Sequence, residues 1–219
     1  MFRNCALYVI LSLAETVYIW PDINEQQETA RRIASTYFFP NCVKMIDGTL
    51  LPLSFKPSTD GETYFSRKKN YSLQMLIVCD DTCRINYYHC GWPGSVHNNH
   101  VWKTCPLAVC PESYSFATNQ YLLGDSAFQG TSLIVPAYKT ANGLSRIPNE
   151  SSFNTLLLSP QVKSEHCIGL LKGSFPWLKD IRILISSALD LQKICKYVRA
   201  AVILHNLLIQ APYKNDSID

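Results

Sequence analysis

The run Val43-Lys44-Met45-Ile46-Asp47, followed by Gly48-Thr49 and residues 50–55, decides the fold class of this chain. Its apolar and β-branched residues predict a strand, or a hairpin with a tight break at Gly48-Thr49. Two further strands are expected at Tyr71–Cys79 and Arg84–Cys90, where apolar residues again dominate. The three segments together predict an antiparallel meander.

Beyond the meander, helical stretches alternate with short strands. In chain order we expect a turn at Gly91–Ser95, a helix at His97–Val109, strands at Gln120–Gly124 and Ser132–Ala137, a loop at Lys139–Ser152, and helices at Pro160–Lys172 and Leu178–Ile209. Residues 1–39 are expected to be helical up to Pro40. This element order is that of an RNase H-like domain. We therefore predict an α/β fold with a mixed five-stranded sheet flanked by helices.

The composition is that of a globular protein with a substantial core. Of the 219 residues, 47% are hydrophobic and 17% are charged, which excludes a disordered chain. The formal net charge of +3 permits a nucleic-acid partner but does not require one. No apolar run approaches the roughly 20 residues that a membrane-spanning helix needs.

The nine cysteines are scattered through apolar stretches. An odd number in such surroundings indicates reduced thiols in an intracellular protein. The apolar run Cys5–Ala14 follows Arg3 and has the length of a secretory signal core, but no small-residue cleavage site follows it. We therefore favour an amphipathic helix there.

Three carboxylates are candidates for metal-dependent chemistry. Asp47 and Asp125 each follow an apolar strand, where the backbone is rigid and the side chain reaches solvent. Glu165 lies in the helix Gln161–Lys172 on one face with Ile168. Clustered carboxylates can hold two divalent ions that activate water for attack on a phosphodiester. Taken singly, the two aspartates fit better as ordinary turn residues beside glycine, and Glu165 as a solvated helix residue.

The sequence around each carboxylate resembles that of the DDE endonuclease domain of PIF/Harbinger-type transposases. The matching motifs are Ile46-Asp47-Gly48-Thr49, Gly124-Asp125-Ser126-Ala127-Phe128, and Glu165 with Gly169-Leu170-Leu171-Lys172. In this sequence 78 positions separate the aspartates and 40 separate Asp125 from Glu165, as in that family. Further similar stretches are Gly91–His97, Tyr64–Tyr71 and Leu204–Leu208, so the resemblance covers residues 40–210.

The resemblance implies a nuclear, metal-dependent DNA endonuclease or transposase domain. Asp47, Asp125 and Glu165 would be both the catalytic residues and the ligands of two Mg²⁺ or Mn²⁺ ions. The implied organisation is an N-terminal helical arm at 1–39, the endonuclease domain at 40–210 and a tail at 211–219. DNA would be the substrate, a separate Myb-like or helix-turn-helix protein could supply target recognition, and the domain could form a homo-oligomer, although the sequence does not give the oligomeric state.

Two positions depart from the family pattern. Asn98 follows His97 where the family usually has aspartate, and Ser174 stands where it usually has arginine. Asn98 cannot supply a negative ligand, and Ser174 cannot clamp a phosphate as arginine does. The alternative is therefore a domesticated, catalytically inactive relative that acts as a nuclear binding or scaffold protein.

Other polar residues of the chain offer candidate contacts and an alternative site. The candidate DNA contacts are Arg67, Lys68, Lys69, His97 and Lys172. Cys79-x3-Cys83 followed by His97-x2-His100 superficially resembles a zinc site, but its last spacing is too short. His205-Asn206 is expected to be a hydrogen-bonded structural pair.

Overall fold

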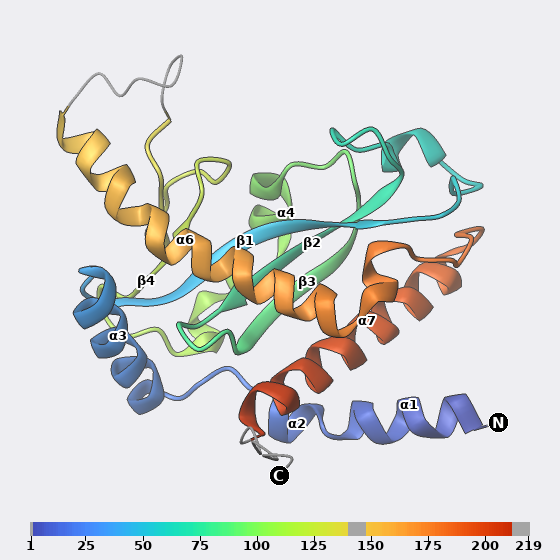
Figure 1. Ribbon diagram of the computed structural model, residues 1–219, viewed down its shortest axis with the longest axis horizontal. Helices are drawn as coiled ribbons and strands as arrows, with labels where there is room; N and C mark the ends of the chain where they lie inside the picture. The colour runs from blue at the N-terminus through green and yellow to red at the C-terminus, as the bar shows by residue number, and fades with distance from the viewer. Residues whose placement is uncertain (1, 140–147, 212–219) are drawn as a thin grey trace, which may run out of the picture.

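A five-stranded mixed sheet forms the centre of the computed structural model, which describes residues 2–139 and 148–211 (Figure 1). The strands are β1 (Cys42–Pro52), β2 (Ser72–Cys79), β3 (Ile85–Pro93), β4 (Tyr121–Gly124) and β5 (Ile134–Pro136), in the order β3-β2-β1-β4-β5. The β1–β2 and β2–β3 pairs are antiparallel, whereas β1–β4 and β4–β5 are parallel. The predicted meander and the RNase H-like mixed sheet are confirmed.

One face of the sheet is covered by α3 (Ile23–Tyr37), α6 (Pro148–Ser174) and α7 (Ala188–Gln210). In Figure 1, α6 crosses in front of β1, and α7 follows on the side of β3. The buried residues of α6 recur every three or four positions, at Leu157, Pro160, Ser164, Cys167 and Leu171. This spacing gives the helix one continuous stripe that packs on the sheet.

The opposite face is covered by α4 (Asn98–Thr104), α5 (Pro106–Val109) and the short helix η2 (Pro111–Tyr114). Leu76 and Val78 of β2 pack there against Val101 and Trp102. The fold therefore has three layers, with the sheet between two helical layers.

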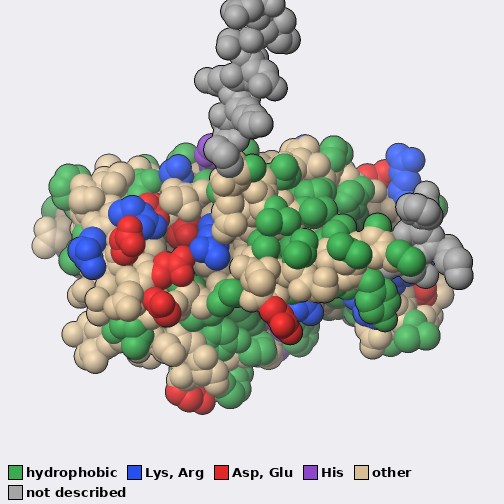
Figure 2. Space-filling model, turned by 90° about the horizontal axis from the view of Figure 1, so that it is seen from below, with side chains coloured by type: hydrophobic (Ala, Val, Ile, Leu, Met, Phe, Trp, Pro, Cys, Tyr) green, Lys and Arg blue, Asp and Glu red, His purple; other side chains and the backbone are tan. Residues whose placement is uncertain are grey.

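The N-terminal residues are helical, as predicted. They form α1 (Phe2–Ser12) and α2 (Ala14–Val17), which contact α7, and then α3. The Asp22 carboxylate begins α3 by accepting a hydrogen bond from the Glu25 N–H at 2.8 Å. Figure 2 shows apolar side chains gathered over α1 and α7, and charged side chains gathered at the α3 end of the same face. No helix in the described ranges is both long and apolar enough to cross a membrane.

Two predicted boundaries within the meander were wrong. β1 continues through Gly48-Thr49 without a break, because both residues pair with β2, opposite Leu76 and Met75. The residues Gly91–Pro93, predicted as part of a turn, instead extend β3, with Trp92 and Pro93 paired to β2. The expected single helix at His97–Val109 is divided into α4 and α5 at Cys105, whose extended backbone precedes Pro106.

The C-terminal helices also differ from the prediction. Residues 140–147 of the predicted loop lie outside the described residues, but 148–152 begin α6, which contains Pro160 in its interior. The predicted helix from Leu178 is replaced by η3 (Pro176–Lys179) and an extended segment, and α7 begins only at Ala188. That segment is extended because the Ile181 N–H donates to Pro52 O, at the end of β1, at 2.9 Å. The Ser187 side chain and Asp190 then form a capping box that begins α7.

The polar pair of α7 has the structural role expected for it. The Asn206 side chain donates to Ile85 O at 2.8 Å and accepts from Ile85 N–H at 2.9 Å, while His205 Nε2 lies 3.0 Å from Cys83 O. Both side chains are buried. Asn206 thus satisfies backbone groups of the edge strand β3 that have no neighbouring strand. All nine cysteines are free, as predicted.

Candidate functional site

Asp47 and Asp125 lie side by side at the centre of the sheet. β1 and β4 are parallel, and Ile46 pairs with Gly124, so the next residue on each strand is a carboxylate. Both side chains are half-buried. The Gly48 N–H donates to Asp47 Oδ1 at 2.6 Å, and the Ala127 N–H donates to Asp125 Oδ1 at 3.0 Å. These bonds orient the carboxylates and leave Oδ2 of each without a hydrogen bond from any described residue.

The pKa of Asp47 reflects the nearby negative charges of Asp125 and Glu165. The pKa of Asp47 is raised to about 7, chiefly by burial and also by the negative charges of Asp125 and Glu165, against the opposing effects of the Gly48 N–H and of Arg67. Burial also raises the pKa of Asp125, with Ala127 N–H and Arg67 acting in the opposite direction. Asp47 therefore tends to keep a proton near neutral pH unless a cation is nearby.

Glu165 comes to this region from α6, on the exposed flank of the helix beside its buried stripe. Lys172 follows seven residues later on the same side of the helix. Its Nζ donates to Thr49 Oγ1 and to Leu50 O, both at 2.7 Å. These bonds fix the C-terminal part of α6 over β1, two residues beyond Asp47.

Basic residues surround the carboxylates. A tight turn at Ser66–Asn70, closed by the Ser66 N–H donating to Asn70 O at 2.8 Å, presents Arg67 and Lys68. Arg67 lowers the pKa of both aspartates by its positive charge. The pKa of Lys172 falls to about 8, chiefly because of burial and then because of repulsion from Lys68 and Lys179. The structure thus brings Arg67 into electrostatic range of both aspartates and Lys172 into range of Asp47, whereas Lys68 is related only to Lys172.

The other two candidate contacts, Lys69 and His97, are less involved. Both are exposed, and neither side chain makes a hydrogen bond or ion pair with any residue that the structure describes. Lys69 occupies a left-handed turn position with φ 59°. His97 precedes the first residue of α4 without capping it through its side chain. Neither is connected to Asp47 or Asp125.

Asn98, the first departure from the family pattern, lies on the other face of β1. Its Oδ1 accepts a hydrogen bond from the buried Gln74 side chain at 2.5 Å. A Cβ on Gly48 would lie 2.1 Å from Asn98 Oδ1, whereas Asp47, the preceding residue, interacts with Glu165 of α6. Successive strand residues point to opposite faces. Asn98 is therefore a packing residue on the α4 side, which the sequence did not reveal. Ser174, the second departure, is exposed at the end of α6.

The donor chemistry of the aspartate pair suits a hard divalent cation, which prefers carboxylate oxygens. The positive charge of a cation would also offset the burial and the repulsion from Asp125 and Glu165 that raise the pKa of Asp47. Within residues 2–139 and 148–211, however, no group of three or more His, Cys, Asp or Glu is arranged to hold a metal ion. Glu165 thus lies in electrostatic range of Asp47 without completing a closed ligand set.

The zinc alternative fails on topology. Cys79 and Cys83 are buried in the core on the α6 side of the sheet. His97 and His100 are exposed at the start of α4, which packs on the opposite side. The sheet therefore separates the two halves of the pattern.

Comparison with known proteins gives one family and one relative. The family described as DDE superfamily endonuclease matches residues 46–206, about three quarters of the chain. The Arabidopsis thaliana protein named antagonist of like heterochromatin protein 1 is 29% identical over 84 residues, which cover 38% of this chain and 21% of that relative. No solved structure matches. The matched region contains all three carboxylates.

Proposed function

The chain belongs to the DDE superfamily endonuclease family, and from this premise we propose that it is a divalent-metal-dependent DNA endonuclease domain of the Harbinger transposase type. The reaction would be hydrolysis of a phosphodiester bond. The observation that carries the proposal is the parallel register of β1 and β4, in which Ile46 pairs with Gly124 and Asp47 and Asp125 follow as neighbours. Asp47 lies within β1 and Asp125 directly follows β4, and such rigid backbone is suited to fixing two ligands of one cation.

Asp47, Asp125 and Glu165 would hold Mg²⁺ or Mn²⁺. Such a cation, when bound, supplies Lewis acidity and neutralises charge at the phosphate. The backbone N–H groups of Gly48 and Ala127 would keep the two aspartates oriented. Because the pKa of Asp47 is about 7, binding of a cation near neutral pH would release its proton.

Arg67, Lys68 and Lys172 would contact the DNA backbone. Lys172 donates two hydrogen bonds to β1, and an ammonium group has three donors, so one remains for a phosphate oxygen. A phosphate there would also favour the charged form of Lys172, whose pKa burial lowers to about 8. Lys69 and His97 would contribute at most to the periphery, since both are exposed and unconnected to the carboxylates.

The proposed setting is the nucleus, with DNA as the substrate. The name of the Arabidopsis thaliana relative refers to heterochromatin and supports a chromatin context, although the match covers 21% of that protein. Target recognition would come from a separate Myb-like or helix-turn-helix protein, and catalysis from a homo-oligomer. These partners follow from the family resemblance alone.

A second candidate is a domesticated module that binds in chromatin without cutting DNA. Two observations favour it: the absence of a closed three-ligand group in the described ranges, and a relative named as an antagonist of another protein. This module would keep the fold and the basic surface while losing cation-dependent chemistry.

Nicking of supercoiled plasmid DNA tests the two candidates, because it needs no knowledge of a target sequence. We expect the purified chain to nick the plasmid with Mg²⁺ or Mn²⁺ and not with EDTA. Asp125→Asn should abolish nicking, because asparagine has nearly the size of aspartate but lacks the negative charge that would bind the cation. Glu112→Gln, which changes an exposed carboxylate in η2, serves as the matched control and should retain activity. Folded protein that never nicks under these conditions would favour the non-cleaving module.

A further inference from the structure

A pocket of about 570 Å³ opens beside the candidate site, along the short edge strand β5. Ala127, whose N–H holds Asp125, lines the pocket together with Phe128 and Gln129. The pocket therefore begins two residues from a carboxylate that would hold the cation at the cleaved phosphate. Its volume lies within the range of about 300–1,000 Å³ that small-molecule sites occupy.

An aromatic side chain stands at one end of this pocket and is firmly held. Tyr138 meets Phe153 edge to face with ring centroids 5.3 Å apart, and Phe153 in turn meets Phe39 at 5.6 Å. The Asn154 carboxamide bonds both backbone groups of Tyr138, at 2.9 and 3.0 Å. Tyr138 is nevertheless 49% exposed. A rigid ring with an open face is suited to stacking.

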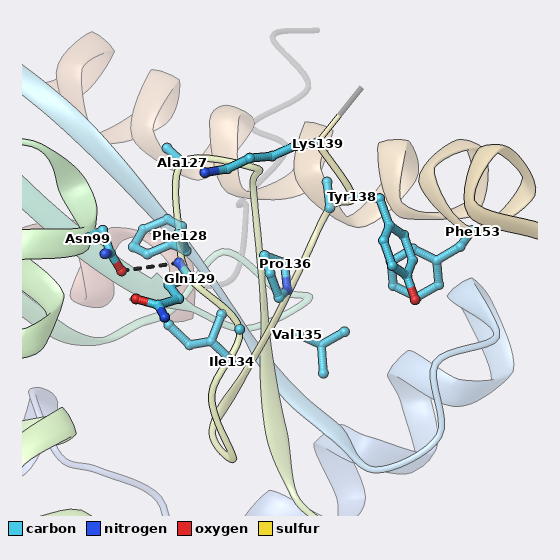
Figure 3. Close-up of a pocket in the computed structure, with 12 residues that line it drawn as sticks. Asn99, Ala127, Phe128, Gln129, Ile134, Val135, Pro136, Tyr138, Lys139 and Phe153 are labelled. Carbon is cyan, nitrogen blue, oxygen red and sulfur yellow. Dashed lines mark hydrogen bonds between the residues drawn. The ribbon is translucent and has the colours of Figure 1, made fainter. Parts of the chain in front are cut away.

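Two carboxamides stand at the other end, as Figure 3 shows, with Pro136 between them and the aromatic pair. Asn99 Oδ1 accepts from the Gln129 N–H at 3.1 Å, which fixes the orientation of this side chain. Its Nδ2 and the whole Gln129 carboxamide make no hydrogen bond within the described part of the chain. Lys139 is an exposed cation on the pocket wall.

We propose that this pocket binds an unpaired nucleobase of the DNA strand, next to the phosphodiester bond that is cleaved. The inference rests on the proposed function, because that function brings DNA to Asp125. The base would stack on Tyr138, its polar edge would face the free donors and acceptors of Asn99 and Gln129, and Lys139 would meet its phosphate. Aromatic stacking combined with carboxamide recognition is the chemistry by which proteins hold unstacked bases.

The test compares two short duplexes that differ only in one unpaired nucleotide, a bulged adenosine or a bulged abasic site. The affinity of the full chain for each is measured by fluorescence anisotropy in EDTA, so that no cleavage occurs. The contacts to the duplex backbone are the same in both, and the ratio of the two affinities therefore reports recognition of the base. Aromatic stacking of a base makes a preference of at least about fivefold for the bulged adenosine the expected result.

Tyr138→Ala and Gln129→Ala should reduce this preference, and Tyr138→Phe should retain most of it because the ring remains. Tyr8→Ala changes a tyrosine that is 79% exposed on α1 and is the matched control, with an unchanged ratio. Equal affinity for the two duplexes, or no binding to either, overturns the inference. The edge of the sheet at β5 would then remain as a surface that could pair with an extended peptide.

The outcome is separable from that of the plasmid assay. Nicking without a base preference would refute the pocket inference alone. A base preference that depends on Tyr138, in a protein that never nicks, would refute the endonuclease and retain the pocket as the DNA contact of a binding module.

Discussion

Asp47→Asn should stabilise the folded protein in the absence of metal. The substitution keeps the size of the side chain and the oxygen that accepts the Gly48 N–H. It removes a negative charge that is half-buried beside Asp125 and Glu165. We expect a buried metal ligand to destabilise the folded protein until a cation binds. An ordinary turn aspartate would not have this effect.

The magnitude follows from the pKa of Asp47, which rises from 3.8 to about 7 on folding. At about 1.36 kcal/mol per pH unit, this change corresponds to a cost of ~4 kcal/mol for the ionised form, and partial solvent exposure reduces it to ~2–4 kcal/mol. Because the folded-state pKa lies above the unfolded value, the favourable contribution is complete below pH 3.8 and lost as the pH rises through about 7. The gain from Asp47→Asn should therefore be absent in acid and reach its full value above neutrality.

Thermal unfolding in EDTA at several pH values measures this gain. For a domain of this size, ~2–4 kcal/mol corresponds to an increase in Tm of about 4–16 °C at pH 8. Adding Mn²⁺ should stabilise the wild-type protein, by ~2.7 kcal/mol at a concentration one hundred times Kd, and should have less effect on the variant. Glu112→Gln provides the control, with little change under any condition. Equal or lower stability of Asp47→Asn at pH 8 would refute the reasoning.

The remaining predictions concern packing around the site. Gly48→Ala should destabilise the fold by about 1–3 kcal/mol, because the added Cβ would displace the Asn98 side chain. A second change, Asn98→Ala, should recover part of this loss. Gly169→Ala is the control and should not destabilise the fold, because nothing lies within 4 Å of the added Cβ. Asn206→Ala should cost about 2–4 kcal/mol in chemical denaturation, because the backbone N–H and C=O of Ile85 lose their buried partner. An unchanged denaturation midpoint in Gly48→Ala would contradict the close approach of Asn98 to Gly48, and an unchanged midpoint in Asn206→Ala would contradict the hydrogen bonds of Asn206 to Ile85.

Local patterns predicted the sheet well because its strands carry their own signals. The apolar runs ending at Asp47 and Cys79 are strands in the structure, and they pair as predicted. The error at Gly48-Thr49 has a physical reason. Glycine in a strand can mark a turn or a close approach of another group, and only the fold shows that the Asn98 side chain occupies the space where a Cβ would lie.

The helix ends were less predictable because tertiary contacts determine them. Residues 180–187 have the apolar content of a helix, yet the Ile181 N–H donates to Pro52 O and the Ser58 N–H to Ile185 O. These long-range bonds replace local helical ones. Conversely, Pro160 suggested a helix start, but α6 continues through it because its stripe is buried on both sides of the proline, at Leu157 and Ser164.

For the candidate site, the sequence predicted a strand end at both aspartates, which holds for Asp125 but not for Asp47, because β1 continues to Pro52. That Asp47 and Asp125 are neighbours depends on the β1–β4 register, which no single segment encodes. The approach of Arg67 to both aspartates, and the bonds from Lys172 to β1, likewise require the fold. The tyrosine at 138 gave no signal at all, since neither its spacing nor its neighbours distinguish it from other surface aromatic residues.

Asn98 bears less on the choice between endonuclease and non-cleaving module than its sequence position suggests. Its side chain bonds Gln74 and fills the space beside Gly48, on the side of β1 opposite α6. The missing carboxylate would therefore not have joined a cation held between β1 and α6. The choice depends instead on Asp47, because burying a carboxylate beside two others costs stability. A module without a cation carries this cost uncompensated, whereas a bound cation offsets it in an endonuclease. Stabilisation by Mn²⁺ that requires Asp47 thus distinguishes the two without knowledge of the DNA target.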